Sequence, residues 1–177
     1  AADDGAAPLP MAADLCGNAW SLTDGGGGLL VLPAHEPDGW REVSQEGTWQ
    51  HLAIDGDGFV WMGGPEGARR LDLRQTGGGW QAPSGAAATT AVTALGLSPD
   101  DRILTGLATG DVLELDIDAS GETLTTSLGT VPSPARGLYS DASGCVWIAA
   151  TDGLYRGGAG RKTWHLEWEK QPGRLPG

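Results

Sequence analysis

The sequence lacks several features that would place it in other classes. No apolar run approaches the roughly 18 residues that a membrane-spanning helix needs, so no transmembrane segment is expected. Basic residues are scarce, with 11 Lys and Arg against 23 Asp and Glu. The resulting net charge of −12 argues against a nucleic-acid partner, because binding to a phosphate backbone needs a basic surface. The opening AADDGAAPLP has no charged segment followed by an apolar core, so no signal peptide is expected. It suits the start of a mature secreted chain.

Phenylalanine and tyrosine are also rare, with one and two copies, whereas tryptophan occurs eight times. This imbalance indicates one structural position that is filled repeatedly by tryptophan. Thirty glycines and eleven prolines without a three-residue period indicate many turns. The 40% hydrophobic content excludes wholesale disorder, and 177 residues are enough for one domain with a core.

A repeat of 41 to 43 residues runs through the chain. Trp20 to Trp61 is 41 residues, and Trp61 to Trp147 is 86, twice 43. Each of these tryptophans follows an aspartate by six residues and a glycine by three. The sets are Asp14/Gly17/Trp20, Asp55/Gly58/Trp61 and Asp141/Gly144/Trp147, and the third of the four copies carries Ser98/Asp101/Leu104 instead. A further glycine follows six residues later in every copy, at Gly26, Gly67, Gly110 and Gly153.

This period predicts an all-β β-propeller with four blades of four antiparallel strands. Repeats of this length form helical solenoids or propeller blades, and each copy here consists of short strands separated by Gly and Asp turns. The second strand of a copy is apolar on both faces, as expected for a sheet stacked between two neighbours. The predicted domain is 1–177, with approximate blades 8–45, 46–86, 87–130 and 131–170 and a tail at 171–177.

The stretches SDASGCVWIAATDGLYR (140–156) and IDGDGFVWMGGPEGARRLD (54–72) carry the pattern D-x-x-G-x-x-W followed by a second glycine. This pattern resembles the propeller repeats of extracytoplasmic sensor regions in bacterial two-component regulators. The resemblance covers nearly the whole chain and implies the fold more than a function. Those regions usually have more than four blades, so the chain is either a small closed propeller or an open part of a larger one.

Two cysteines occupy nearly equivalent positions in copies one and four, Cys16 and Cys145. In a closed four-blade ring these copies are neighbours, and a disulfide is predicted between them. The chain-entropy model gives a stabilisation of roughly 4 to 5 kcal/mol for a loop of that size. Hemopexin-like propellers clamp their first and last blades in this way, which supports the bond by analogy. The alternative is two small buried thiols.

No catalytic, metal or cofactor site is predicted. The segment DGDGFVWMGGPEG (55–67) matches an EF-hand loop at its first, third and twelfth positions but has Phe59 and Val60 at the fifth and sixth, where an oxygen ligand and a glycine are needed. A looser cation site at Asp55 and Asp57 stays open. No phosphate-binding loop or G-x-S-x-G nucleophile elbow is present, and three scattered histidines lack metal-site spacing.

The expected function is therefore that of a non-catalytic periplasmic or extracellular propeller. It would be a scaffold or accessory subunit that binds a protein partner in a larger assembly, with membrane-associated complexes among the candidates. The C-terminal stretch is weakly basic and is the predicted partner-binding strip: Arg156, Arg161, Lys162, Lys170 and Arg174. Two alternatives stay open. One is a sensor module that binds a small molecule or glycan in the central channel, which His51 and Arg136 would line, and the other, less favoured, is a propeller lyase.

Overall fold

The computed structural model describes residues 9–36, 38–43, 47–74, 79–158 and 163–169. These residues form fifteen β-strands and two short 3₁₀ segments, η1 (Asp24–Gly26) and η2 (Gly85–Ala88). The strands make four separate antiparallel sheets, each contiguous in the chain. The predicted all-β propeller architecture is confirmed. None of the described helices could span a membrane.

Each sheet is a blade, numbered here in chain order. Blade 1 contains β1 (Met11–Ala13), β2 (Ala19–Leu22), β3 (Leu29–Leu32) and β4 (Arg41–Val43). Blade 2 contains β5 (His51–Ile54), β6 (Phe59–Gly64) and β7 (Gly67–Asp72). Blade 3 contains β8 (Val92–Leu97), β9 (Ile103–Leu107), β10 (Asp111–Ile117) and β11 (Thr123–Thr130). Blade 4 contains β12 (Ala135–Ser140), β13 (Cys145–Ala150), β14 (Gly153–Gly158) and β15 (His165–Glu169).

Blade 2 departs from the expected four strands. Within its described part, the fourth strand is reduced to one antiparallel bridge between Arg70 and Gln81, with both backbone N–H···O distances at 2.9 Å. Pro83 follows two residues later and has no backbone N–H to extend the ladder.

The first hairpin of blades 1, 2 and 4 is shaped by its aspartate, and in blade 3 the Ser98 hydroxyl accepts the Arg102 backbone N–H at 3.2 Å. In blade 2, the Asp55 Oδ1 accepts the backbone N–H groups of Asp57 and Phe59 at 3.1 and 2.9 Å, while Oδ2 accepts the Trp61 indole N–H at 2.7 Å. Asp14 does the same in blade 1, where its Oδ2 lies 2.9 Å from the Trp20 Nε1. The Asp-Gly-Trp spacing is therefore a local turn that also fixes the ring of the tryptophan.

The fourth residue of this turn, three after the aspartate or serine, adopts a left-handed conformation in every blade. Gly17, Gly58 and Gly144 have φ of +82°, +84° and +78°, and Asp101 of blade 3 has φ of +58°. Aspartate is one of the few side chains that tolerate this region. The conformation of the turn is thus kept in the copy that lacks both the glycine and the tryptophan.

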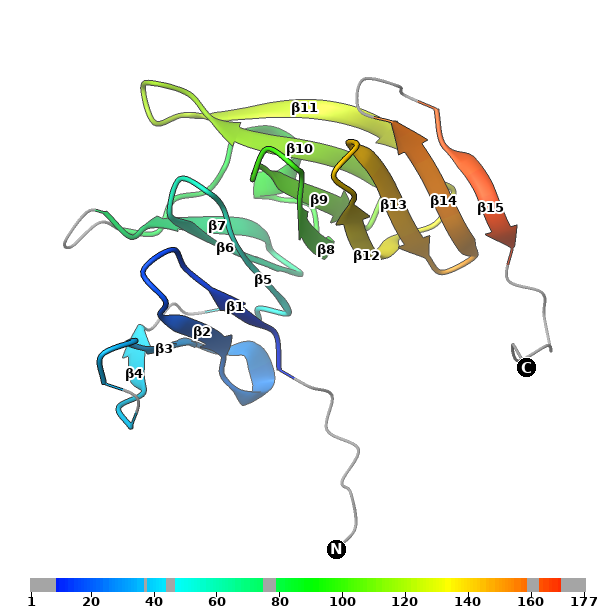
Figure 1. The fold of residues 1–177 in the computed structure, drawn as a ribbon. Coiled ribbons are helices and arrows are strands. Elements are labelled where there is room, and N and C mark those ends of the chain that lie inside the picture. Colours follow the sequence, from blue (N-terminus) through cyan, green and yellow to red (C-terminus); the bar gives the residue numbers. More distant parts are fainter. Residues whose placement is uncertain (1–8, 37, 44–46, 75–78, 159–162, 170–177) are drawn as a thin grey trace, which may run out of the picture.

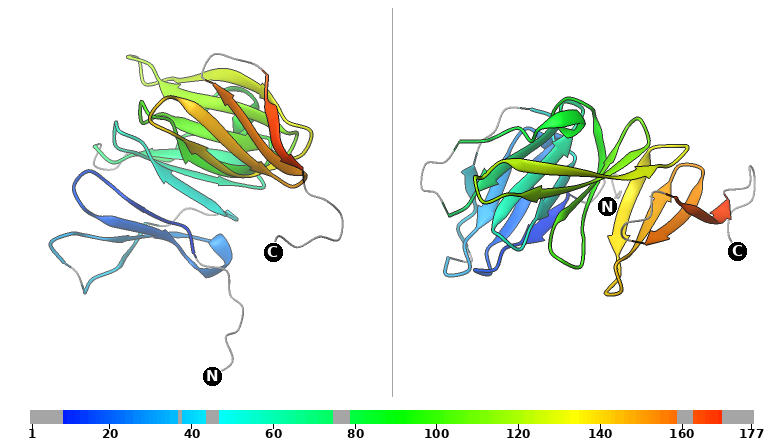
Figure 2. Two further views of the ribbon diagram at one scale, coloured as in Figure 1. Left: turned by 45° about the vertical axis from the view of Figure 1, so that its right-hand side comes forward. Right: turned by 90° about the horizontal axis from the view of Figure 1, so that it is seen from above.

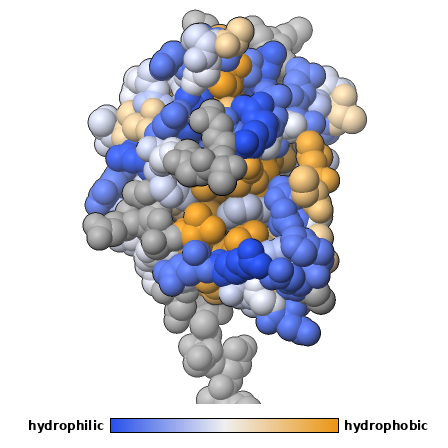
Figure 3. Space-filling view, turned by 90° about the vertical axis from the view of Figure 1, so that its left-hand side faces the viewer, coloured by the Kyte–Doolittle hydropathy of each residue, from blue (hydrophilic) through white to orange (hydrophobic). Residues whose placement is uncertain are grey.

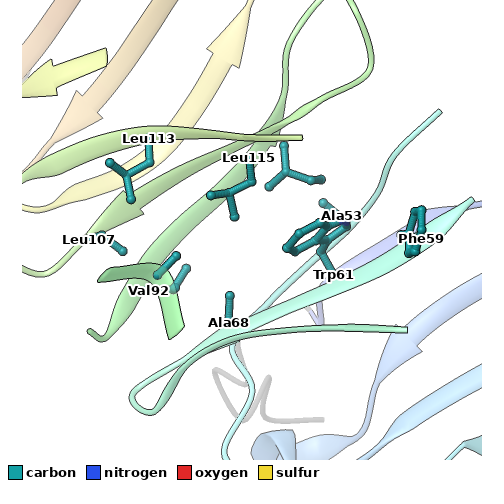
Figure 4. Packing of buried hydrophobic residues seen from close by; sticks show 10 residues of the cluster. Ala53, Phe59, Trp61, Ala68, Val92, Leu107, Leu113 and Leu115 are labelled. Carbon is teal, nitrogen blue, oxygen red and sulfur yellow. The ribbon is translucent and has the colours of Figure 1, made fainter. Parts of the chain in front are cut away.

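The core consists of three clusters, one between each pair of consecutive blades. The cluster between blades 2 and 3 is built around Trp61, which is fully buried (0% exposed) and points from β6 toward blade 3 (Figure 4). A second joins blades 1 and 2 around Trp20, and a third joins blades 3 and 4 around Leu104. Each therefore contains the tryptophan or leucine of the repeat from its earlier blade.

Blades 1 and 4 lie at the two ends of this series (Figures 1 and 2). Among the described residues, each hydrophobic cluster joins consecutive blades, and none joins blade 4 to blade 1. The predicted Cys16–Cys145 disulfide is not formed. Both cysteines are free, Cys16 exposed and Cys145 partly buried, because the turns that carry them belong to end blades that do not pack together. The blades form an open arc.

Candidate functional site

The face of blade 4 that points away from blade 3 is the first candidate surface. Cross-strand partners share a face, and the pairs Tyr139–Trp147 and Trp147–Arg156 place these three side chains in one row. Leu154 and Trp168 form a second pair on this side. We call this surface the open face of blade 4, defined by Tyr139, Trp147, Leu154, Arg156 and Trp168.

Trp147 occupies the repeat position that is buried in blades 1 and 2. Trp20 and Trp61 pack against the following blade, whereas Trp147 is only partly buried because no described blade follows. Tyr139 beside it is 64% exposed. The Arg156 guanidinium lies over the Trp147 ring, 5.4 Å from its centroid, and its Nε is 3.0 Å from the Glu167 carboxylate. Arg156 thus covers part of an apolar surface that internal blades cover with a neighbour.

The aspartate of this blade keeps its structural role. Hydrogen bonds from the Ser143 hydroxyl (2.6 Å) and the Cys145 backbone N–H (3.0 Å) hold the pKa of Asp141 below its usual value, and the Trp147 indole acts in the same direction. In blade 2, by contrast, burial raises the pKa of Asp55 in spite of its hydrogen bonds. The two turns have the same geometry but differ in solvent access.

Blade 1 has the complementary open face. The pairs Met11–Ser21 and Ala13–Ala19 lie on the side of the sheet opposite Trp20, with Leu30 and Leu32 continuing the rows. Met11 is 64% exposed. We call this surface, defined by Met11, Ala13, Ala19, Leu30 and Leu32, the open face of blade 1.

A second candidate site lies where the inner strands of blades 2, 3 and 4 begin. A cavity of about 340 Å³ is lined there by seven residues, and we call it the inner-strand mouth: Gln50, His51, Thr93, Pro134, Ala135, Arg136 and Thr151. His51 and Arg136, which sequence analysis placed in the channel, do line one cavity. Burial lowers the pKa of His51, so the neutral imidazole is favoured. The Arg136 Nε donates to the Thr151 hydroxyl at 3.3 Å.

Two other cavities are lined by several carboxylates, and the arginines that line them are already paired with neighbouring groups. One of about 360 Å³ is lined by Asp55, Asp57, Asp100, Asp101 and Asp116, together with Arg102. Arg102 is 2.9 Å from Glu114 and 3.1 Å from Asp116. Over the described ranges, no three His, Cys, Asp or Glu side chains gather in a way that could hold a metal ion. The looser cation site considered at Asp55 and Asp57 therefore gains no third ligand.

The cavity of about 880 Å³ between β7 and the β10–β11 hairpin centres on Arg70, a residue that sequence analysis did not single out. Arg70 is 4% exposed and lies over the Phe59 ring, 5.3 Å from its centroid. Its Nη2 donates to the Gln81 Oε1 at 2.8 Å and to the Gly121 carbonyl. Burial lowers the pKa of Arg70, which neighbouring carboxylates oppose. Arg70 joins blades 2 and 3 across 51 residues of sequence, so no local pattern could have revealed it.

The predicted basic strip is described only in part. Arg156 lies on the open face of blade 4, whereas Arg161, Lys162, Lys170 and Arg174 lie outside the described residues. Viewed from the side of blades 1 and 2, hydrophilic residues cover much of the surface, with apolar patches between them (Figure 3).

The sequence matches no family model and no curated protein. Solved structures do match. Virginiamycin B lyase from Staphylococcus aureus gives a TM-score of 0.68 at 12% identity, covering 94% of this chain and 56% of that one. The gluconolactonase XC5397 from Xanthomonas campestris gives 0.65 at 15% identity, covering 88% and 60%. The extracellular domain of the hybrid two-component system BT4673 from B. thetaiotaomicron gives 0.66 at 16% identity, covering 91% and 22%.

The fold is that of a β-propeller. The last of these matches also bears out the resemblance to two-component sensor regions at the level of fold. The chain spans little more than half the length of the lyase and about three fifths of the gluconolactonase. At these identities the likeness concerns architecture alone, and it includes both enzymes and an extracellular sensor domain.

Proposed function

We propose that this protein is a non-catalytic, extracytoplasmic propeller module that binds other proteins through the open faces of its end blades. The observation that carries this proposal is the outward position of Trp147, which fills an inter-blade repeat position without a following blade. The partner surface that fits it is a propeller blade presenting the kind of face that blade 2 presents to blade 1. That face consists of Leu52, Ile54, Val60 and Met62 packed against Trp20.

The two open faces are of complementary types. Blade 4 presents the side that internal blades turn toward the following blade, and blade 1 presents the side that they turn toward the preceding one. Stacking one on the other would continue the interface already repeated three times within the chain. Such head-to-tail contacts are heterologous, so two different surfaces meet.

The roles of the aspartates support a non-catalytic function. The carboxylates of Asp14, Asp55, Asp118 and Asp141 each accept backbone N–H groups of their own turn. The shifts in their pKa values result from these hydrogen bonds and from burial. An extracytoplasmic location is supported by the likeness to an extracellular domain. Purified protein should neither cleave virginiamycin B nor hydrolyse gluconolactone above the uncatalysed rate. Turnover by the native protein that disappears after heat denaturation would contradict the non-catalytic function.

The docking proposal is tested with a second copy of the chain as the probe, because each copy carries both faces. In sedimentation velocity, the wild type should associate with increasing concentration. Tyr139→Glu and Met11→Glu each place a charge on one open face, at residues that are both 64% exposed, and each variant alone should remain monomeric. Leu124→Glu is the matched control, since Leu124 is 52% exposed on the outer strand of blade 3 and should leave association unchanged.

Mixing the two variants provides the decisive outcome. Tyr139→Glu retains an intact blade 1 face and Met11→Glu an intact blade 4 face, so an equimolar mixture should give a heterodimer that cannot extend. A wild type that stays monomeric up to millimolar concentration overturns the proposal. So does association that survives both substitutions, since it would use another surface.

A further inference from the structure

The inner-strand mouth is built from repeat-equivalent positions of three blades. Gln50, Thr93 and Arg136 each lie five residues before the aspartate or serine that begins the hairpin turn of their copy. The blades therefore bring three different polar side chains to one end of their inner strands. His51 and Thr151 complete the polar lining, and Pro134 and Ala135 supply apolar surface. The cavity of about 340 Å³ lies at the lower end of the range of small-molecule sites, roughly 300–1,000 Å³.

Hydrogen-bond donors without partners gather in this cavity. Arg136 uses its Nε for the Thr151 hydroxyl at 3.3 Å, and its two Nη groups have no partner among the described residues. Thr93 differs, since its hydroxyl donates to the Gly106 carbonyl at 3.3 Å. The exposed fork of Arg136, the amide of Gln50 and the imidazole of His51 are thus free to contact a ligand. Arg136 is exposed and His51 is half-buried, so the charged group lies toward the solvent.

The charge of the mouth is opposite to that of the protein as a whole. The chain carries 23 acidic and 11 basic residues, yet none of the seven residues that line this cavity is acidic. The nearby Asp152 is held by hydrogen bonds to Ser133 and, at 2.6 Å, to the Tyr155 hydroxyl. Of the cavities described above, the other two contain four or more carboxylates each. An anion therefore meets less repulsion at the mouth than at either of them.

We propose that the inner-strand mouth binds a small hydroxylated carboxylic acid of about monosaccharide size, with its carboxylate on the two Nη groups of Arg136. The guanidinium fork matches the two oxygens of a carboxylate and pairs with them in a bidentate manner. The hydroxyl groups of the ligand meet Gln50, His51 and Thr151. This site is independent of the open faces of the end blades.

The experiment measures the binding of glucuronate to the full chain by isothermal titration calorimetry at pH 7 and low ionic strength. Glucose is the neutral counterpart of the same ring, and inorganic phosphate is the alternative anion. Glucuronate should bind, glucose should bind at least tenfold more weakly, and phosphate should not compete. Arg136→Gln removes the charge while keeping a polar side chain, and it should weaken glucuronate binding at least tenfold.

Two further variants make the result specific. Arg41→Gln removes an exposed arginine of β4 in blade 1, which lies outside the mouth, and should leave glucuronate affinity unchanged. His51→Asn tests the second contact and should weaken binding while leaving circular dichroism unaltered. The proposal is overturned if glucuronate does not bind or if Arg136→Gln binds it as well as the wild type. Equal binding of glucose, or tighter binding of phosphate, also overturns it.

Discussion

Replacing Trp61 and Trp147 separately by alanine tests whether one repeat position has different energetic weight in an internal and an end blade. Trp61 is fully buried, and removing a buried tryptophan side chain destabilises a protein by about 3–5 kcal/mol. Its indole also donates to Asp55 at 2.7 Å, and Asp55 is 8% exposed. Loss of that donor adds about 1–3 kcal/mol for a carboxylate left short of a partner.

We therefore expect Trp61→Ala to lower the free energy of unfolding by about 4–8 kcal/mol, a large part of the roughly 5–15 kcal/mol available to a domain. Trp147→Ala should lower it by only about 1–2 kcal/mol, because the ring is only partly buried and is covered by the Arg156 guanidinium instead of by a following blade. The measurement is urea unfolding followed by circular dichroism.

A third variant keeps this comparison informative if Trp61→Ala does not fold. Trp61→Phe keeps a six-membered aromatic ring in the cluster but loses the indole N–H together with the five-membered ring, so it should cost at least the roughly 1–3 kcal/mol of the lost hydrogen bond and less than Trp61→Ala. The reasoning is refuted if Trp147→Ala costs as much as Trp61→Ala. That result would mean that the face of blade 4 is covered as completely as an internal interface.

Four further predictions follow from particular contacts. Gly110→Ala should destabilise the protein more than Gly121→Ala. Both glycines have positive φ (+89° and +86°), but a Cβ at Gly110 would lie 2.2 Å from the Val131 carbonyl oxygen, whereas a Cβ at Gly121 would face open space. Equal urea midpoints for the two variants would contradict this. Burial acts to raise the pKa of Asp14, but hydrogen bonds from Trp20 and Asn18 outweigh it and lower that pKa below 3.8. The contribution of Asp14 to stability is therefore present above pH 3.8 and is lost as the pH falls through its lowered pKa. Asp14→Asn should flatten the dependence of the urea midpoint on pH in this range. Burial and the Asp152 carboxylate raise the pKa of Tyr155 to about 12. The contribution of Tyr155 to stability is therefore complete below about pH 10 and is lost as the pH rises through about 12. In absorbance at about 295 nm, Asp152→Asn should shift the Tyr155 titration toward about pH 10. Both cysteines should react with a thiol reagent in the native protein, Cys16 faster, and reductant should leave the unfolding midpoint unchanged; a reductant-sensitive midpoint would restore the disulfide.

The second glycine of each repeat shows how far a local pattern reaches. The spacing of the repeat identifies Gly26, Gly67, Gly110 and Gly153. In blades 1 to 3, a Cβ at this glycine would lie 2.1–2.5 Å from a carbonyl oxygen of the segment that leads into the next blade: Trp49, Ala88 and Val131. In blade 4 the nearest carbonyl is that of Trp168 in its own β15, at 2.3 Å. The spacing revealed the position, but the contact that requires glycine there comes from the tertiary structure.

By itself the sequence determined the repeat, the hairpin turns and the class of fold. These depend on interactions within a few residues, such as Asp55 with Phe59 and Trp61, so their spacing is visible in the chain. It also predicted that His51 and Arg136 lie on inner strands that face a common space, and both line the inner-strand mouth.

Only the tertiary structure decided whether the outer faces of blades 1 and 4 are covered. The predicted Cys16–Cys145 disulfide does not form, and among the described residues no hydrophobic cluster joins blades 1 and 4. The burial of Arg70 and the exposure of Tyr139 likewise depend on which blade lies opposite. A repeat specifies the inside of each unit in nearly the same way every time. Whether its last face is covered depends on long-range packing, which local spacing does not encode.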